Sequence, residues 1–391
     1  MRNFSNRHFE NREYRRNRGK AVSAALAMAL MTGLMTGCGT ETASSETASS
    51  AGAASSAQEQ TESSTFTVSA EDAASDTDAQ SDDADGGDTG DGEKLNIVAT
   101  IFPEYDWVRE ILGDQADQAE VTMLLDNGVD LHSYQPTADD LVKVSNCDLF
   151  IYVGGESDAW VEDALKNATN PDMKVINLLD VLGDQVKEEE TVEGMEPEEE
   201  EKGSEGEAAE EGPEYDEHVW LSLKNAEVLC KAIASDIEEL DPENKDAYEA
   251  NLTSYEEKLA DLDEQYQSTV DSAARKTLLF GDRFPFRYMV DDYGLTYYAA
   301  FVGCSAETEA SFETISFLAK KVDELQLPCV MTIEGPNHKI ATTIIENTKE
   351  KDQKILTMDS MQSTTSEDVK SGTTYLSVMA RNLDVLQEAL N

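Results

Sequence analysis

The fold is decided by three consecutive stretches, KLNIVATIF (94–102), EYDWVREILG (104–113) and AEVTMLL (119–125). The first and third are short, apolar runs, which is typical of buried strands. The second has apolar residues at helical spacing and ends at Gly113, which is a common helix stop. A strand, a helix and a second strand in succession predict parallel strands joined by a crossover helix.

The same alternation of strand and helix patterns fills most of the remaining chain. A Glu-rich insertion at 184–217 interrupts it, and it resumes after a long charged helical pattern. We therefore expect an α/β fold with two lobes of parallel-type sheet flanked by helices, joined by one long backbone helix. The predicted divisions are an N-terminal lobe at 94–241 that includes the acidic loop, a linking helix at 242–274 and a C-terminal lobe at 275–391.

The first 37 residues predict a secretory signal peptide rather than part of the fold. A basic stretch precedes the apolar run AVSAALAMALMTGLMTG (21–37), which is too short for a spanning helix. LMTGC (34–38) resembles a bacterial lipobox, which implies cleavage after Gly37 and lipidation of Cys38. The alternative is an uncleaved anchor with an incidental cysteine. Residues 38–93 are small and polar, which predicts a disordered tether.

The chain is strongly acidic, with 81 Asp and Glu against 30 Lys and Arg and a net charge of −51. This charge argues against binding nucleic acid, whose phosphates need basic patches, and favours attraction of cations. The cysteines after Cys38 show no CxxC spacing, so a zinc–thiolate cluster is not expected.

The three histidines outside the predicted signal peptide fall in loops. His132 follows the strand AEVTMLL, His338 follows CVMTIE, and His218 precedes a helix. Asp282 also ends a strand pattern, LLFGD. Ligands of open α/β sheets bind beyond the carboxyl ends of strands, and Zn²⁺ takes imidazole and carboxylate ligands. These residues therefore predict a metal site in the cleft between the lobes, against the alternative that each histidine is structural.

Two motifs carry a family resemblance, GVDLHSYQPTADD (128–140) and DEHVWLSL (216–223). They resemble the two histidine motifs of the zinc/manganese ABC-transporter substrate-binding lipoproteins, and the resemblance runs from Leu95 to Asn391. It implies that a metal ion is held in the interlobe cleft and delivered to a membrane permease with a cytoplasmic ATPase. It also implies that the protein is not an enzyme, and we expect a monomer anchored outside the cytoplasmic membrane.

The third and fourth ligands depart from the family pattern. FRYMVDDYGL (286–295) resembles the helix after the third ligand, normally a His or Glu, and the candidates here are Asp282 and its neighbour Arg283. His338 stands where manganese-type members have a carboxylate, with Glu334 as the alternative ligand. The expected metal ligands are His132, His218, Asp282 and His338.

Cys304 and Glu307 lie in GCSAETEAS (303–311), which resembles a family loop near the cleft. We expect them to support the ligands from outside, and a direct bond from Cys304 to zinc is the alternative. Three imidazoles and one carboxylate favour Zn²⁺ over Mn²⁺, which prefers oxygen.

Other functions remain as alternatives: a manganese-specific binding protein, a metal-dependent adhesin, a zinc hydrolase or a carrier of haem. The sequence contains no HExxH motif and no adhesive repeats. The acidic loop 184–217 is expected to be mobile, and it either concentrates cations for the cleft or is a solvated loop without a role.

Overall fold

A computed structural model describes residues 94–195, 214–305 and 309–391. These residues belong to one compact unit, Gly86–Asn391. The predicted signal peptide, the tether, Cys38, Glu307 and most of the acidic loop lie outside the described residues. Within the described part of the chain, no helix is both long enough and apolar enough to cross a membrane.

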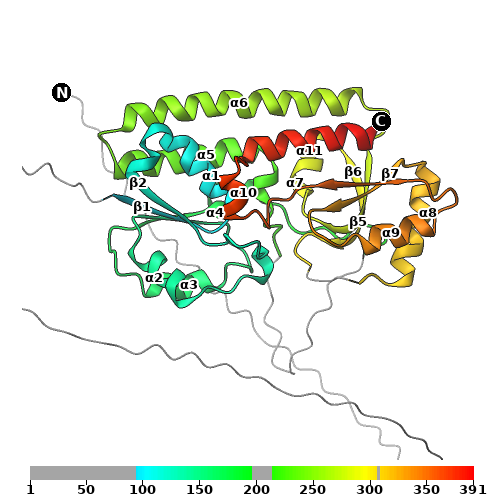
Figure 1. Ribbon diagram of the computed structural model, residues 1–391, viewed down its shortest axis with the longest axis horizontal. Helices are drawn as coiled ribbons and strands as arrows, with labels where there is room; N and C mark the ends of the chain where they lie inside the picture. Colours follow the sequence, from blue (N-terminus) through cyan, green and yellow to red (C-terminus); the bar gives the residue numbers. More distant parts are fainter. Residues whose placement is uncertain (1–93, 196–213, 306–308) are drawn as a thin grey trace, which may run out of the picture. The chain divides into compact units, whose positions relative to one another are not determined.

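The first lobe contains a four-stranded parallel sheet in the order β2-β1-β3-β4 (Figure 1). Its strands are β1 (Leu95–Ala99), β2 (Ala119–Met123), β3 (Leu149–Tyr152) and β4 (Lys174–Asn177). Its helices are α1 (Phe102–Leu112), α2 (Ala138–Asn146), α3 (Trp160–Lys166) and α4 (Leu178–Leu182). The parallel pairing of β1 with β2 through α1 confirms the prediction made from the first three stretches.

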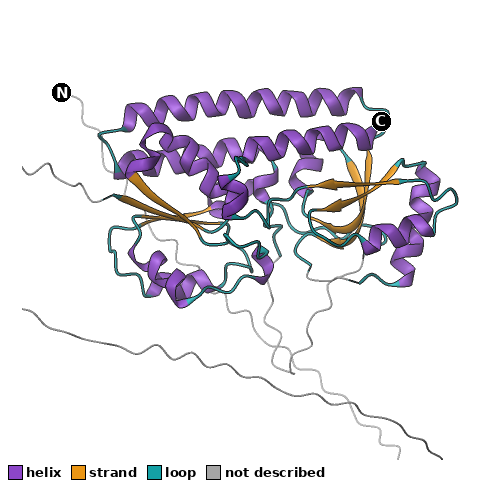
Figure 2. Ribbon diagram, in the orientation of Figure 1, coloured by secondary structure: helices purple, strands orange, loops and turns teal. Residues whose placement is uncertain are grey.

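The second lobe repeats this topology, with a parallel sheet in the order β6-β5-β7-β8. Its strands are β5 (Thr277–Phe284), β6 (Thr296–Val302), β7 (Cys329–Ile333) and β8 (Lys354–Met358). Its helices are α7 (Arg287–Tyr293), α8 (Phe312–Leu325), α9 (Lys339–Glu346), α10 (Ser366–Lys370) and α11 (Tyr375–Leu390). Two parallel sheets flanked by helices confirm the predicted fold class (Figure 2).

Two helices connect the lobes, α5 (Leu223–Leu240) and the 28-residue α6 (Lys245–Ser272). The buried residues of α6 recur at intervals of three, four or seven positions, which gives it one apolar stripe: Tyr248, Tyr255, Leu259, Leu262, Tyr266 and Val270. Asn251 donates to the Ile111 carbonyl at the end of α1, and the Tyr266 hydroxyl donates to Met379 of α11. The long helix is therefore fastened to both lobes.

The C-terminal helix α11 also reaches the first lobe. The backbone N–H of Tyr375 donates to Asp106 of α1 at 2.8 Å, and its hydroxyl donates to the Trp220 carbonyl at 2.7 Å. These bonds are buried, so the start of α11 stabilises the position of the segment that follows His218.

The buried Glu104 side chain makes stability depend on pH. Its Oε2 accepts hydrogen bonds from Thr100 and Ile101, but burial and the nearby Asp158 raise the pKa of Glu104 to about 8. An unfolded glutamate titrates near 4.3, so between these values the folded state binds the extra proton. The stabilisation from this proton is present at low pH and is lost as pH rises towards 8.

We therefore predict that Glu104→Gln changes the pH dependence of unfolding. The difference in unfolding free energy between the variant and the parent chain should shift in favour of the variant as pH rises from 5 to 8, because glutamine stays uncharged. Urea unfolding of the full chain in metal-free buffer measures this difference. A difference that is constant over this range would contradict the prediction.

Candidate metal centre

His132 is held by the loop that follows β2. It lies in a short 3-10 turn, Leu131–Ser133, whose Leu131 side chain is buried. Asp130 caps this turn by accepting a hydrogen bond from the backbone N–H of His132 at 3.0 Å. The apolar anchor and the Asp cap together fix the direction of the imidazole.

His218 is fully buried and directly precedes the turn Val219–Leu221. The three side chains of that turn are also buried, and their packing into the core fixes the position of His218. Asp216 accepts hydrogen bonds from both the backbone N–H and Nδ1 of His218, each at 2.9 Å. A carboxylate can only accept, so it places the proton of the neutral ring on Nδ1 and leaves Nε2 with a free lone pair.

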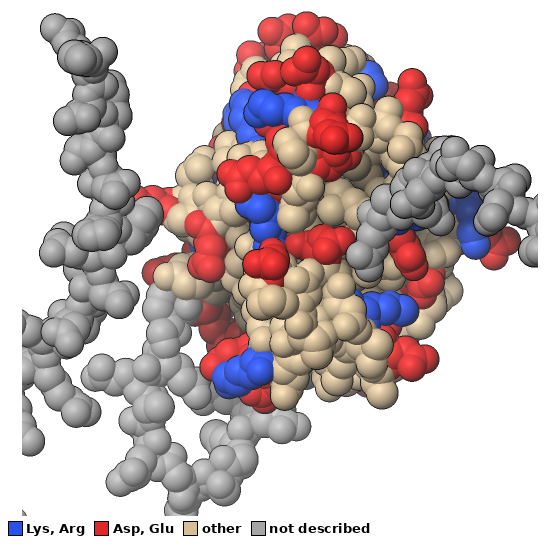
Figure 3. All heavy atoms as spheres, turned by 90° about the vertical axis from the view of Figure 1, so that its left-hand side faces the viewer, with Lys and Arg blue, Asp and Glu red and all other residues tan. Residues whose placement is uncertain are grey.

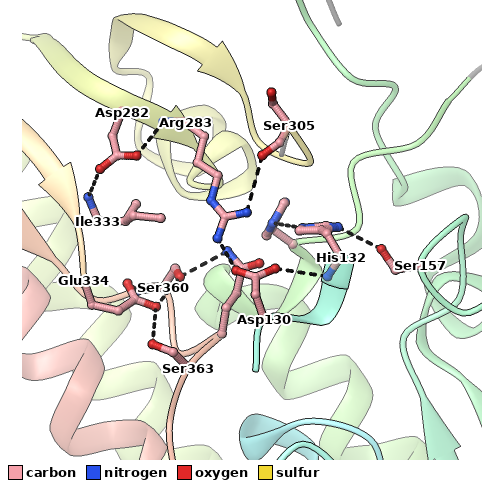
Figure 4. Close-up of polar contacts among 12 residues, drawn as sticks. Asp130, His132, Ser157, Asp282, Arg283, Ser305, Ile333, Glu334, Ser360 and Ser363 are labelled. Atoms are coloured by element: carbon pink, nitrogen blue, oxygen red, sulfur yellow. Dashed lines mark hydrogen bonds and ion pairs between the residues drawn. The ribbon is translucent and has the colours of Figure 1, made fainter. Parts of the chain in front are cut away.

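The two imidazoles face each other through their Nε2 atoms, which lie 3.2 Å apart. Nδ1 of His132 lies 2.8 Å from the Ser157 hydroxyl (Figure 4). The same atom lies 3.6 Å from Glu217 Oε2, and these surroundings favour a proton on Nδ1. Two nitrogens bound to tetrahedral zinc at about 2.0–2.1 Å are separated by roughly 3.3 Å. The observed separation of 3.2 Å is close to this value, and it is also that of an N–H···N hydrogen bond between the two rings.

The pKa values of the two histidines shift in opposite directions. Burial and, after it, the neighbouring His218 lower the pKa of His132 to about 3. Burial acts most strongly on His218 and would lower its pKa, but the Asp216 and Glu217 carboxylates together outweigh it and the net shift is upward. His132 is therefore neutral at physiological pH, as a metal ligand must be.

Cys304 is the third ligand-type residue at this place. The candidate ligand atoms of His132, His218 and Cys304 all lie within 4.8 Å of one another. Among the residues that the structure describes, this is the one group of three or more His, Cys, Asp or Glu side chains with metal-site spacing.

A cavity of about 260 Å³ borders this group and is walled by carboxylates. Its lining residues are His132, Glu156, Ser157, Glu189, Glu214, Tyr215, Glu217 and Cys304. Glu217 Oε1 accepts from the backbone N–H of Ser157 at 2.9 Å, while Glu217 Oε2 is buried without a hydrogen-bond partner. Nδ1 of His132 lies 3.6 Å from this oxygen, which is beyond hydrogen-bond distance, so a cation in this cavity would satisfy the oxygen.

Arg283, at the end of β5, brings a positive charge to the same region. Its guanidinium pairs with Asp130 of the first lobe and lies 3.5 Å from the Ser305 carbonyl (Figure 4). This charge acts to lower the pKa of both His132 and His218. The ion pair therefore links the two lobes beside the imidazoles.

Asp282 and His338 lie outside the three-residue group, so their role as ligands stays a prediction. Asp282 accepts hydrogen bonds from the backbone N–H groups of Arg283 and Ile333 at 3.0 and 3.3 Å. Successive side chains of a strand point to opposite sides, so Arg283 rather than Asp282 points towards the imidazoles. His338 directly precedes α9, and its Nδ1 is buried without a hydrogen-bond partner.

Glu334, the alternative ligand, is also engaged elsewhere. It accepts hydrogen bonds from the backbone N–H and the hydroxyl of Ser360, both at 2.7 Å. It lines a second cavity, of about 300 Å³, together with Asp130, Asp282 and Arg283. This second cavity adjoins the Asp130–Arg283 pair.

Three carboxylates at the site were not singled out from the sequence: Asp216, Glu217 and Glu189. The first two directly precede His218 in DEHVW, so their proximity to the ring could have been inferred. Glu189 belongs to the acidic insertion, where no pattern distinguishes it from its neighbours. It accepts a hydrogen bond from the backbone N–H of Cys304 at 3.0 Å, which ties the insertion to the site.

The two described ends of the acidic insertion, residues 184–195 and 214–217 (its stems), make specific contacts with each other and with the second lobe. Glu188 and Tyr215 form an antiparallel bridge. The backbone N–H of Lys187 donates to the Tyr288 hydroxyl, which in turn donates to the Asp216 carbonyl. Acidic side chains are also spread over the face of the molecule shown in Figure 3, with Lys and Arg among them.

Comparisons with a family model, with curated proteins and with solved structures indicate the same protein family. A family model described as zinc-uptake complex component A, periplasmic (ZnuA) matches residues 97–389. The zinc-binding lipoprotein AdcA of Streptococcus pneumoniae R6 is 30% identical over 297 residues, 75% of this chain and 56% of the relative. The high-affinity zinc uptake system protein ZnuA of Bacillus subtilis is 31% identical over 299 residues, 76% and 88% of the two chains.

Among solved structures, the Zn(II)-bound ZnuA-like domain of S. pneumoniae AdcA superposes with a TM-score of 0.59 and 27% identity, covering 76% of this chain and 99% of that domain. The chain spans about half the length, 56%, of the full AdcA lipoprotein. The family match covers both lobes and both histidine motifs, so the chain belongs to the family of the periplasmic zinc-uptake component ZnuA.

Proposed function

We propose that this protein captures Zn²⁺ outside the cytoplasmic membrane and delivers it to an ABC permease. The observation that carries the proposal is the pair of imidazoles, His132 and His218, whose Nε2 atoms face each other at 3.2 Å. Nδ1 of His218 is held by Asp216 and Nδ1 of His132 lies against Ser157, so both Nε2 lone pairs are directed at one point. Such an arrangement suits a cation, either a proton shared between the two Nε2 atoms or a metal ion bound by both.

The donor atoms favour zinc over manganese. The group consists of two imidazole nitrogens and one thiol, whereas Mn²⁺ prefers carboxylate and water oxygens. The relatives AdcA and ZnuA carry zinc in their names, which supports the same choice. The net charge of −51 raises the local concentration of cations around the protein.

The remaining parts of the function follow from the family. Its members are components of zinc uptake, so we propose a permease with a cytoplasmic ATPase as the partner and no chemical change in the cargo. We also propose that Cys38 is lipidated and anchors a monomeric protein to the membrane, as the lipobox resemblance implies.

A metal titration of the full-length protein tests the proposal. One Zn²⁺ should bind per chain, and Mn²⁺ should compete only at concentrations at least about 100-fold higher, because nitrogen and sulfur donors discriminate against it. Elemental analysis gives the stoichiometry, and competition with a chromophoric chelator gives the affinities. Absence of stoichiometric zinc, or a preference for Mn²⁺, would contradict the proposed cargo.

A further inference from the structure

We propose that Cys304 is a ligand of the bound zinc ion, so that the site holds the metal through two imidazoles and one thiolate. The inference rests on the proposed zinc capture and adds a sulfur ligand from the second lobe. The imidazoles come from the first lobe and the segment before α5, while Cys304 lies just after β6. Zinc bound in this way would join the two lobes directly.

The backbone brings Cys304 close to His218. A Cβ atom built on the preceding residue, Gly303, would lie only 3.0 Å from Nδ1 and Cε1 of the His218 ring. The glycine thus permits the backbone before Cys304 to approach the His218 ring more closely than a residue with a side chain would. The three candidate ligand atoms lie within 4.8 Å of one another, and ligands of tetrahedral zinc lie roughly 3.3–3.6 Å apart. A movement on the order of 1 Å would bring the thiol into coordination.

A second feature of the cavity points to the same ion. Glu217 is only 2% exposed, and its Oε2 has no hydrogen-bond partner although it lines the cavity with His132 and Cys304. The ion at this place would satisfy the oxygen, either directly as a fourth ligand or through a bound water. Glu189 accepts from the backbone N–H of Cys304 and so holds the thiol at the cavity.

The other three described cysteines have different surroundings. Cys147, Cys230 and Cys329 are buried, and none of them belongs to the metal-site group. Cys304 is half-buried and borders the cavity. The chain therefore offers a matched control in which a thiol is removed away from the site.

Cobalt(II) in place of zinc gives a direct readout of a thiolate ligand. Full-length protein loaded with Co²⁺ should show a sulfur-to-cobalt charge-transfer band in the near ultraviolet. The band should persist in Cys329→Ala and disappear in Cys304→Ala. Zinc affinity should fall at least about 10-fold in Cys304→Ala and stay near the parent value in Cys329→Ala, since even outer partners of a metal site contribute 10–100-fold.

The outcomes separate this inference from the proposed function. Cobalt that binds in a manner dependent on His132, without the sulfur band, would overturn the thiolate ligand and leave zinc capture standing. Failure of the parent chain to bind any stoichiometric metal would overturn both. Alkylation of Cys304 in the parent chain provides a test that needs no variant: zinc should protect this thiol, and equal labelling with and without zinc would refute the inference.

Discussion

His218→Ala should weaken zinc binding by two to three orders of magnitude. Structural zinc sites with four ligands bind with about 10–16 kcal/mol, so one ligand accounts for roughly 2.5–4 kcal/mol. Each 1.4 kcal/mol corresponds to tenfold in affinity. Competition titration of the full chain with zinc measures the effect.

His338→Ala is the matched control for this change. It also removes one imidazole, but His338 lies outside the group formed by His132, His218 and Cys304. We expect its zinc affinity to stay within about threefold of the parent value, as for a residue without contact to the ion. Equal losses in both variants would instead support the ligand set expected from the sequence, in which His338 binds the metal.

Arg283→Gln should strengthen zinc binding by roughly tenfold or more. The Arg283 charge acts to lower the pKa of both His132 and His218, and it would repel a divalent cation bound between them in the same way. Asp130, which pairs with the guanidinium, is present in both chains, so the gain in affinity equals the repulsion that Arg283 itself contributes, and a tenfold gain corresponds to about 1.4 kcal/mol. Replacing arginine by neutral glutamine removes the repulsion and leaves Asp130 as an extra negative charge near the site.

The control for this variant is Arg109→Gln, which neutralises an exposed arginine on α1. Zinc affinity and the rate of zinc release into excess chelator should change in Arg283→Gln and stay constant in the control. Weaker binding in Arg283→Gln would show that the Asp130–Arg283 pair stabilises the metal-binding arrangement instead of opposing the ion.

The sequence predicts the scaffold well because its local patterns and its tertiary structure agree. The apolar runs at 94–102 and 119–125 become the parallel neighbours β1 and β2, and the charged pattern at 242–274 contains α6. The loops of His132 and His218 were expected to meet, and the structure brings their Nε2 atoms to 3.2 Å. Strand ends and buried turn residues are features that a single sequence displays.

The choice between Asp282 and Arg283 was not accessible in this way. Which of two adjacent residues faces the site depends on strand register, and a shift by one residue exchanges the two sides. The pairing of β5 with β6 is irregular between Phe280 and Arg283, which is the kind of local distortion that redirects a side chain. Gly281 in GDRF is a residue type that often accompanies a bulge, but it does not tell which of the next two side chains faces the site.

The stems of the acidic insertion illustrate a second limit of prediction from a single sequence. Their sequence has no apolar period, so we expected a mobile loop, yet Asp216 and Glu217 are buried at the imidazoles and Glu189 binds the Cys304 backbone. Glutamates that line a metal site and glutamates that face solvent look alike in the sequence. Only the tertiary contacts distinguish them.

A crystal structure of the zinc-loaded full chain, with anomalous scattering recorded at the zinc edge, would locate the ion. We predict a single zinc ion about 2.0–2.1 Å from Nε2 of both His132 and His218. A zinc ion bound elsewhere, with the two imidazoles still facing each other and neither in contact with it, would contradict the proposed site.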